Sequence, residues 1–200
     1  MRSLYHFSFI LVILVCLLAG TAMGQSNPTG ERSTAFGMKV GFIFGGTVNF
    51  EGKDAHAYEG DFDTDKSYSF GVFLDFPFHK ALHAQVSLDI HDFALDSRLG
   101  DASENLLLGS VGLRYVFRTE DKRLAVRPGA SIGYGYMSDV DVTDATTHVI
   151  SVISSEFVFY PGQKMGILVE LGMLWDVSGG NDEYDVTGGP MPLIRGGLMF

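Results

Sequence analysis

Seven charged side chains stand singly inside segments that otherwise alternate apolar residues with small ones. They are Lys39, Asp75, Arg114, Arg127, Glu156, Glu170 and Arg195. An isolated charge is tolerated in an enclosed setting only when an opposite charge pairs with it. Counting residues from the nearest tight turn predicts three pairs at similar heights: Lys39 with Asp75, Arg127 with Glu156, and Glu170 with Arg195. Arg114 then takes Gln85 or Asp89 as its partner.

Two histidines, His91 and His148, raise the question of catalysis. His148 has Ser151 and Ser154 close to it in sequence. A serine nucleophile needs a base within hydrogen-bond reach and a third group that orients the base. No spacing in the sequence supplies that arrangement, so both histidines are interpreted as surface residues and the chain is expected not to be an enzyme.

Two acidic segments suggest calcium: DFDTD at 61–65 and DVDVTD at 139–144. Oxygen ligands at alternating positions suit Ca²⁺, but the EF-hand pattern fails here. Lys66 stands where that pattern needs glycine, and Val72 stands where it needs a bidentate glutamate. We interpret both segments as solvated loops and expect no metal and no cofactor.

The first 24 residues have the pattern of a secretory signal peptide. Arg2 precedes an apolar run at 9–20, and Ala22 and Gly24 supply the small residues of a cleavage site. Cys16, the only cysteine, lies within this segment. The mature chain is therefore expected to enter an oxidising compartment without thiols or disulfides.

The remaining residues are enough for one domain, expected at 35–200 after a short segment at 25–34. The chain is acidic, with a formal net charge of −10. A negative charge argues against nucleic acid as a partner.

Alternation with period two, the signature of β-strands, recurs along this domain. It covers eight segments: 36–50, 67–76, 81–90, 107–117, 125–136, 153–160, 165–176 and 192–200. Tight turns are expected at 78–80, 119–123 and 161–164, and long acidic loops at 51–66, 96–104, 138–147 and 177–187. The pattern predicts an all-β fold, an eight-stranded antiparallel up-and-down barrel.

The composition of the two faces predicts which one lies inside. A soluble barrel has an apolar interior, whereas an outer-membrane barrel turns its apolar face to lipid. Here the polar face is rich in glycine and serine, and aromatics such as Tyr68, Phe76 and Trp175 gather near strand ends, as they do at membrane interfaces. The chain is therefore read as a transmembrane barrel with the seven charges inside, low in the lumen. Above them a shallow cup lined by small residues is expected: Gly41, Gly45, Ser69, Gly71, Ser131, Gly133, Gly135 and Gly172.

The signal peptide, the eight strands, the unequal loops and the terminal LMF resemble small bacterial outer-membrane β-barrel proteins of the OmpA and OmpX type. The resemblance implies location in the bacterial outer membrane, periplasmic chain ends and surface loops. It also implies that Leu198 and Phe200 form the C-terminal signal read by the barrel-assembly machinery. The glycine usual in that signal sits one place off, at Gly196.

The expected function is a structural or surface-interaction role without catalysis, with a plugged polar interior. The alternative is a narrow channel for ions or small solutes, and a minor alternative is a lipid A-modifying enzyme. The expected partners are outer-membrane lipid, lipopolysaccharide and the barrel-assembly machinery. A minor alternative for the acidic loops is bridging by divalent cations to lipopolysaccharide phosphates. Any extracellular ligand would bind at those loops, because loops on a rigid scaffold carry specific binding.

Overall fold

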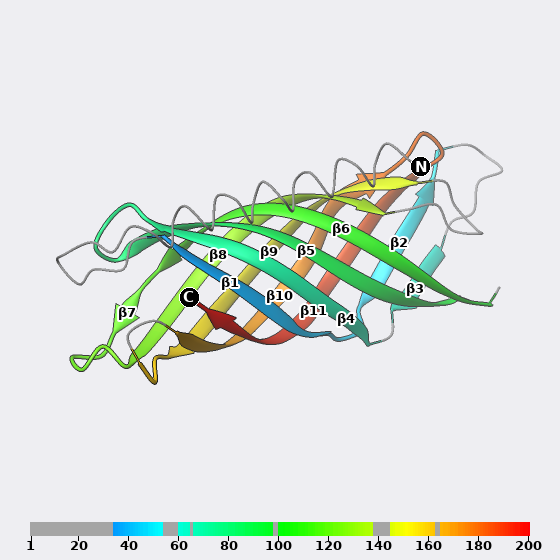
Figure 1. Cartoon of the computed structure of the whole chain (residues 1–200). Helices are drawn as coiled ribbons and strands as arrows, with labels where there is room; N and C mark the ends of the chain where they lie inside the picture. The colour runs from blue at the N-terminus through cyan, green and yellow to red at the C-terminus, as the bar shows by residue number, and fades with distance from the viewer. Residues whose placement is uncertain (1–33, 54–59, 65, 98–99, 138–144, 163–164) are drawn as a thin grey trace, which may run out of the picture.

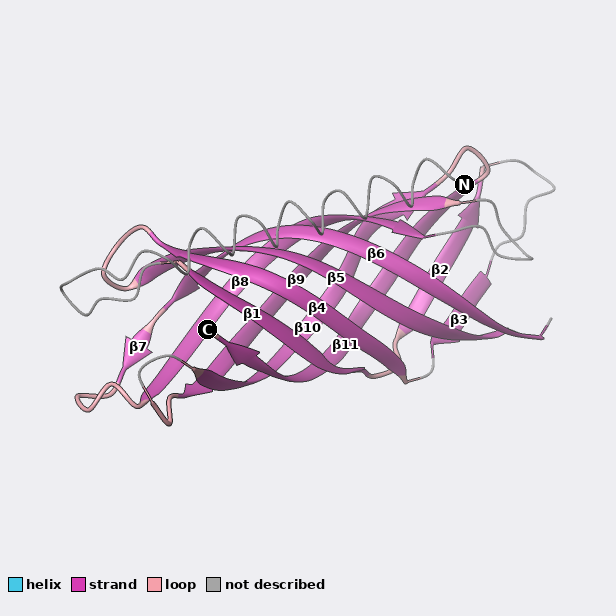
Figure 2. Ribbon diagram, in the orientation of Figure 1, coloured by secondary structure: helices cyan, strands magenta, loops and turns pink. Residues whose placement is uncertain are grey.

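The computed structural model describes residues 34–53, 60–64, 66–97, 100–137, 145–162 and 165–200, and within these ranges it contains strands and turns (Figures 1 and 2). The strands are β1 (Ala35–Ile43), β2 (Thr47–Gly52), β3 (Gly60–Thr64), β4 (Ser67–Pro77), β5 (Leu82–Ser97), β6 (Gly100–Tyr115), β7 (Phe117–Arg118), β8 (Leu124–Met137), β9 (Thr146–Phe159), β10 (Gly166–Gly180) and β11 (Tyr184–Met199).

These eleven segments make eight barrel strands, because three of the barrel strands are each interrupted and consist of two segments. β1 and β2 both pair with β11 in one unbroken register, in which Gly41 faces Arg195 and Val48 faces Gly188. β3 and β4 follow each other along the next strand, as do β6 and β7. The antiparallel pairing of β1 with β11 closes the ring. The predicted eight-stranded antiparallel barrel is confirmed.

The two ends of the barrel differ, and one end departs from the prediction. Connections around 78–81 and 119–123 are tight turns, as expected, and we call this the turn end; the turn expected at 161–164 lies partly outside the described residues. At the other end, the loop end, the long loops expected at 96–104 and 177–187 are wrong. β5 and β6 are separated by only two residues, and β10 and β11 by three.

The outward face is apolar across the middle of every barrel strand. Val40, Val111 and Ile153 each expose more than half of their surface. The same outward band includes the exposed side chains of Phe70, Val86, Ile132, Val169 and Ile194. Such an apolar band is stable when it faces the hydrocarbon of a membrane. A closed barrel can lie there because every backbone N–H and C=O group is hydrogen-bonded between strands. The described residues hold no helix long and apolar enough to cross a membrane.

Candidate functional site

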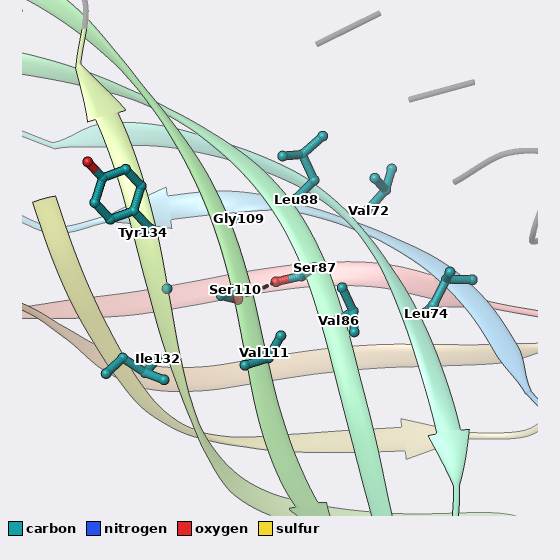
Figure 3. A pocket seen from close by; sticks show the side chains of 11 residues that line it. Val72, Leu74, Val86, Ser87, Leu88, Gly109, Ser110, Val111, Ile132 and Tyr134 are labelled. Carbon is teal, nitrogen blue, oxygen red and sulfur yellow. Dashed lines mark hydrogen bonds between the residues drawn. The ribbon is translucent and has the colours of Figure 1, made fainter. Parts of the chain in front are cut away.

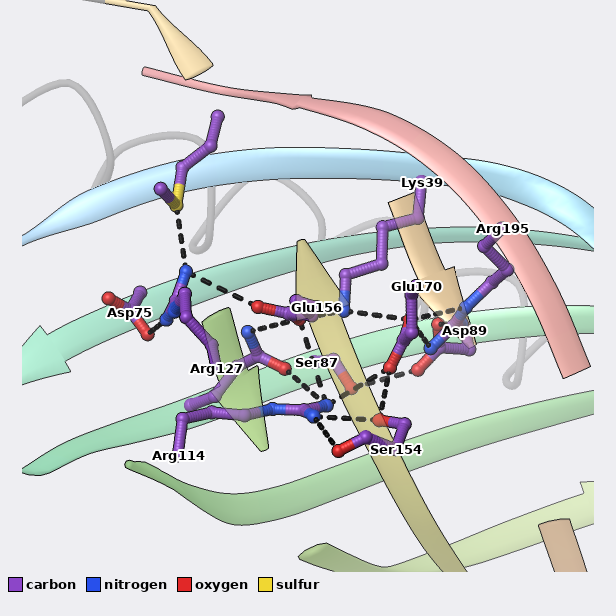
Figure 4. Close-up of polar contacts among 12 residues, drawn as sticks. Lys39, Asp75, Ser87, Asp89, Arg114, Arg127, Ser154, Glu156, Glu170 and Arg195 are labelled. Carbon is purple, nitrogen blue, oxygen red and sulfur yellow. Dashed lines mark hydrogen bonds and ion pairs between the residues drawn. The ribbon is translucent and has the colours of Figure 1, made fainter. Parts of the chain in front are cut away.

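The interior of the barrel holds a layer of buried charge (Figure 4). Eight side chains make it, four cations and four carboxylates: Lys39, Arg114, Arg127, Arg195, Asp75, Asp89, Glu156 and Glu170. All eight are buried, and Glu156 and Glu170 are completely so. The formal charges cancel, which is the condition under which buried ions are tolerated.

Two glutamates hold this charged layer together. Glu170 lies 3.1 Å from Lys39 Nζ, 3.1 Å from Arg114 Nη2 and 2.8 Å from Arg195 Nη2. Glu156 lies 2.5 Å from Lys39 Nζ and 3.3 Å from Arg127 Nη1. Lys39 therefore bridges the two glutamates, and each glutamate serves at least two cations.

Neutral polar side chains complete the layer around Arg114. Ser154 Oγ accepts a hydrogen bond from Arg114 at 2.7 Å and donates one to Glu170 at 2.6 Å. Gln85 accepts from Arg114 at 3.3 Å and donates to Glu156 at 3.1 Å. These hydrogen bonds satisfy buried N–H groups of Arg114 that the ion pairs alone would leave without an acceptor.

The structure brings all seven sequence-predicted residues together, but one predicted pair is wrong. Arg127 faces Glu156 directly, and Glu170 faces Arg195. Lys39 faces Gly71, four places along β4 from Asp75. It therefore reaches across the lumen to the glutamates.

Asp75 instead pairs with Arg127 and with His83 Nδ1, the latter at 2.6 Å. Asp89, expected only as a partner of Arg114, pairs with Arg195 at 2.5 Å.

Apolar side chains fill the lumen on both sides of the charged layer. Along β10 the inward residues are Leu168, Glu170 and Leu174 in turn, so apolar residues precede and follow the charge. The turn-end cluster comprises Ala35, Phe73, Val116, Ala125, Val158, Tyr160, Leu168 and Met199. The loop-end cluster comprises Ile43, Leu106, Leu108, Ile150, Val152, Leu174, Met191 and Leu193. The predicted open cup of small residues is wrong, because this second cluster occupies its place.

Glycines leave the room that the large interior side chains need. A Cβ at position 37 would collide with the ring of Phe73, and a Cβ at position 71 would collide with Oδ1 of Asp89. The Phe73 ring lies 4.6 Å from Lys39 Nζ, a cation–π contact. The inward glycines had suggested an open cup. At Gly37 and Gly71 the space beside the glycine is instead occupied by a neighbouring side chain.

The structure separates His148 from the two serines that are close to it in sequence. Ser151 faces outward, and Ser154 belongs to the charged layer. His148 is buried, with its Nδ1 2.5 Å from Asp176 Oδ2 and its Nε2 2.7 Å from Thr146 Oγ1. Asp176 lies two residues after the inward Leu174, so alternation along β10 already places its carboxylate inside, and the register irregularity in the pairing with β9 follows it, between Asp176 and Ser178. His91 is also buried, so reading either histidine as a surface residue was wrong.

Neither calcium candidate is assembled by the described side chains. DVDVTD at 139–144 lies outside the described residues. Asp61 and Asp63 lie in the β2–β3 ladder, opposite Asn49 and Thr47. No three histidine, cysteine, aspartate or glutamate side chains converge to hold a metal in the described part of the chain.

A hollow of about 390 Å³ lies on the outward face of β4, β5, β6 and β8 (Figure 3). It centres on Gly109, whose cross-strand neighbours are Leu88 and Tyr134. Ser87 and Ser110 hydrogen-bond to each other at 2.7 Å at its floor. Its walls are apolar and belong to the outward band of the barrel.

Comparisons with known proteins agree with this geometry. Two similar solved structures are the outer membrane protein OprG from Pseudomonas aeruginosa and Neisserial surface protein A (NspA). OprG aligns at 11% identity and a TM-score of 0.59, over 84% of this chain and 96% of its own. NspA aligns at 12% identity and a TM-score of 0.56, over 83% of this chain and 95% of its own. At such identities the likeness shows the fold alone.

The sequence itself gives the family. No curated protein matches the chain. The family profile named "Outer membrane protein beta-barrel domain" matches residues 12–188, most of the sequence. An apolar band around a closed barrel is what such a domain needs in its membrane. The chain therefore belongs to the outer membrane protein β-barrel domain family, and it is a protein of the bacterial outer membrane.

Proposed function

We propose that this protein is a closed, non-catalytic outer-membrane barrel with a structural or surface-interaction role. The observation that carries the proposal is the filled lumen, in which two apolar clusters enclose a charge-balanced layer. An eight-stranded barrel is just wide enough for side chains to fill it. A solute would have to displace both apolar clusters and separate the ion pairs.

The space left inside supports a closed lumen. Beside the charged layer, near Asp89, His91 and Arg195, lies a cavity of about 10 Å³. A volume of that size is roughly what a single water molecule requires. It is too small for a continuous column of water or hydrated ions.

Burial of the histidines supports the non-catalytic part of the proposal. Thr146, His148 and Asp176 have the order of nucleophile, base and orienting carboxylate, but each is at least nine-tenths buried. A hydroxyl enclosed in this way has no face for a lipid A substrate. The proposed role of the three side chains is to close the loop end of the lumen.

The remaining parts of the proposal concern assembly and partners. Residues 1–24 would be a cleaved signal peptide and 25–34 a short periplasmic segment. Leu198 and Phe200 would present the signal to the barrel-assembly machinery. In support, Phe200 exposes 40% of its surface and exchanges backbone hydrogen bonds with Phe36. Lipopolysaccharide and any extracellular ligand would meet the acidic loop end.

Single-channel recording of the refolded mature protein in a planar bilayer tests the closed lumen. We expect a folded, inserted barrel with no conductance steps, because the described side chains of the two apolar clusters and the charged layer fill the lumen. A shift in gel mobility on heating is the control for folding. Stable steps that change in size when Glu170 or Arg195 is replaced would contradict the proposal and make the charged layer the gate of a narrow channel.

A further inference from the structure

The two ends of the barrel carry opposite charge. Among the described residues of the turn end, two carboxylates, Glu120 and Asp121, accompany four cations: Lys80, Arg118, Lys122 and Arg123. At the loop end, Lys53 and Lys66 accompany six carboxylates: Glu51, Asp63, Asp92, Asp182, Glu183 and Asp185. A strongly acidic chain therefore has a net positive charge at one end. We call the four turn-end cations the basic arc.

The backbone places the basic arc along one side of the turn end. The turn that carries Lys80 lies against the end of β6, because Val116 N donates to Ala81 O at 2.7 Å. β7 ends at Arg118, and the turn after it holds Lys122 and Arg123. All four cations are exposed. None of them takes part in the ion pairs formed among the described residues.

The nearest carboxylate is engaged by the turn itself. Asp121 Oδ1 accepts hydrogen bonds from the Thr119 hydroxyl at 2.6 Å and from the Arg123 backbone N–H at 3.1 Å. The Thr119 hydrogen bond is the main reason that the pKa of Asp121 lies below its usual value, and the Arg123 N–H adds to it. Oδ1 of this carboxylate therefore serves the turn. The charge of Arg123 also contributes to the lowered pKa of Asp121, whereas Lys80, Arg118 and Lys122 do not figure among its causes.

Exposed aromatics set the height of the basic arc in the membrane. Phe78 and Phe117 each expose more than half of their surface, and Tyr115 nearly half. The rings of Tyr115 and Phe117 pack at 4.7 Å between centroids. Aromatic side chains anchor at the level of the lipid headgroups. The basic arc, one or two residues further from the apolar band, then lies among the headgroup phosphates.

We propose that the basic arc binds the headgroups of anionic glycerophospholipids in the periplasmic leaflet. Tight turns of outer-membrane barrels lie on the periplasmic side. Cations beside an anionic leaflet attract its lipids, and arginine and lysine both pair with phosphate oxygens. Charge complementarity excludes the acidic loop end from this role. The site is independent of the closed lumen, because all four side chains lie outside it.

Fluorescence quenching by brominated lipids tests this proposal. Trp175 is the only tryptophan of the sequence and lies on the outward face near the loop end. Combining Trp175→Phe with Phe117→Trp moves the reporter to the basic arc. Each protein is refolded in phosphatidylcholine vesicles with a fraction of brominated phosphatidylglycerol or, separately, brominated phosphatidylcholine. The same lipid mixture in both leaflets makes the result independent of orientation.

We expect the reporter at position 117 to favour phosphatidylglycerol over phosphatidylcholine by about five-fold, roughly the effect of one cation acting on one anionic lipid. Trp175 should show no such preference. Combining Lys80→Gln, Arg118→Gln, Lys122→Gln and Arg123→Gln should abolish the preference, as should 1 M salt, in which the screening length falls to about 3 Å. Lys53→Gln, at the loop end, is the matched control and should leave it unchanged.

Three results would overturn the proposal. One is equal quenching by both lipids at position 117. Another is a preference that survives replacement of all four cations in a barrel whose heat-dependent gel shift proves it folded. The third is an equal preference for lipid A phosphates when lipid A competes with phosphatidylglycerol, which would mean that the arc recognises phosphate of any source.

Discussion

Replacing Glu170 by glutamine is expected to destabilise the folded barrel by about 3–5 kcal/mol, the usual cost of removing one member of a buried ion network. Glu170 lies within 3.1 Å of Lys39, Arg114 and Arg195. Glutamine keeps the size of the side chain but removes its charge, so the layer is left with one unbalanced cation where water cannot reach. Urea unfolding of the refolded protein in lipid vesicles, followed by Trp175 fluorescence, measures the change.

A second replacement separates charge balance from lost hydrogen bonds. Adding Lys39→Met to Glu170→Gln leaves three cations and three carboxylates. The double variant should therefore recover at least half of the lost stability. Glu51→Gln removes an exposed carboxylate and should change the free energy of unfolding by less than about 1 kcal/mol. Equal effects of Glu170→Gln and Glu51→Gln would contradict a buried network held by Glu170.

The barrel was predictable because period-two alternation is a local signal that the bilayer makes strict. An outward residue between 36 and 43 must be apolar wherever it meets lipid, and the inward charges stand out against that rule. Alternation fades beyond the membrane, because both faces of a strand then meet water. For that reason the polar residues at 96–104 and 177–187 suggested loops, although the backbone ladder continues through most of them.

The contacts inside the barrel were harder to predict, because contacts across a lumen depend on the length of the side chains and on the tilt of the strands. Strand register alone predicted the pair of Arg127 with Glu156 and the pair of Glu170 with Arg195, because the members of each pair lie directly opposite each other on neighbouring strands. Lys39 instead crosses to Glu156, on a strand 117 residues away. The apolar clusters were missed because inward leucines such as Leu106 and Leu108 adjoin outward Leu107, so the run shows no alternation there.

Replacing Gly71 by alanine is expected to destabilise the barrel by about 3 kcal/mol, through crowding and the weakening of one buried ion pair. A methyl group at position 71 would collide with Asp89 Oδ1, the atom that pairs with Arg195. Asp89 must then turn away. Because both partners are buried, Arg195 keeps Glu170 as a partner but loses Asp89 with no bulk water to replace that carboxylate.

Gly109→Ala is the matched control, since it makes the same chemical change in a strand of the same barrel. A Cβ there meets nothing within 4 Å, because it points into the outward hollow. Gly109→Ala should therefore leave the free energy of unfolding unchanged or raise it by about 0.5 kcal/mol, because alanine lowers the conformational entropy of the unfolded chain. Urea unfolding of the two variants in the same vesicles makes the comparison. If they lose stability equally, glycine is needed for the strands themselves. If only Gly71→Ala does, the inward glycine is the space in which the ion pair of Asp89 and Arg195 is built.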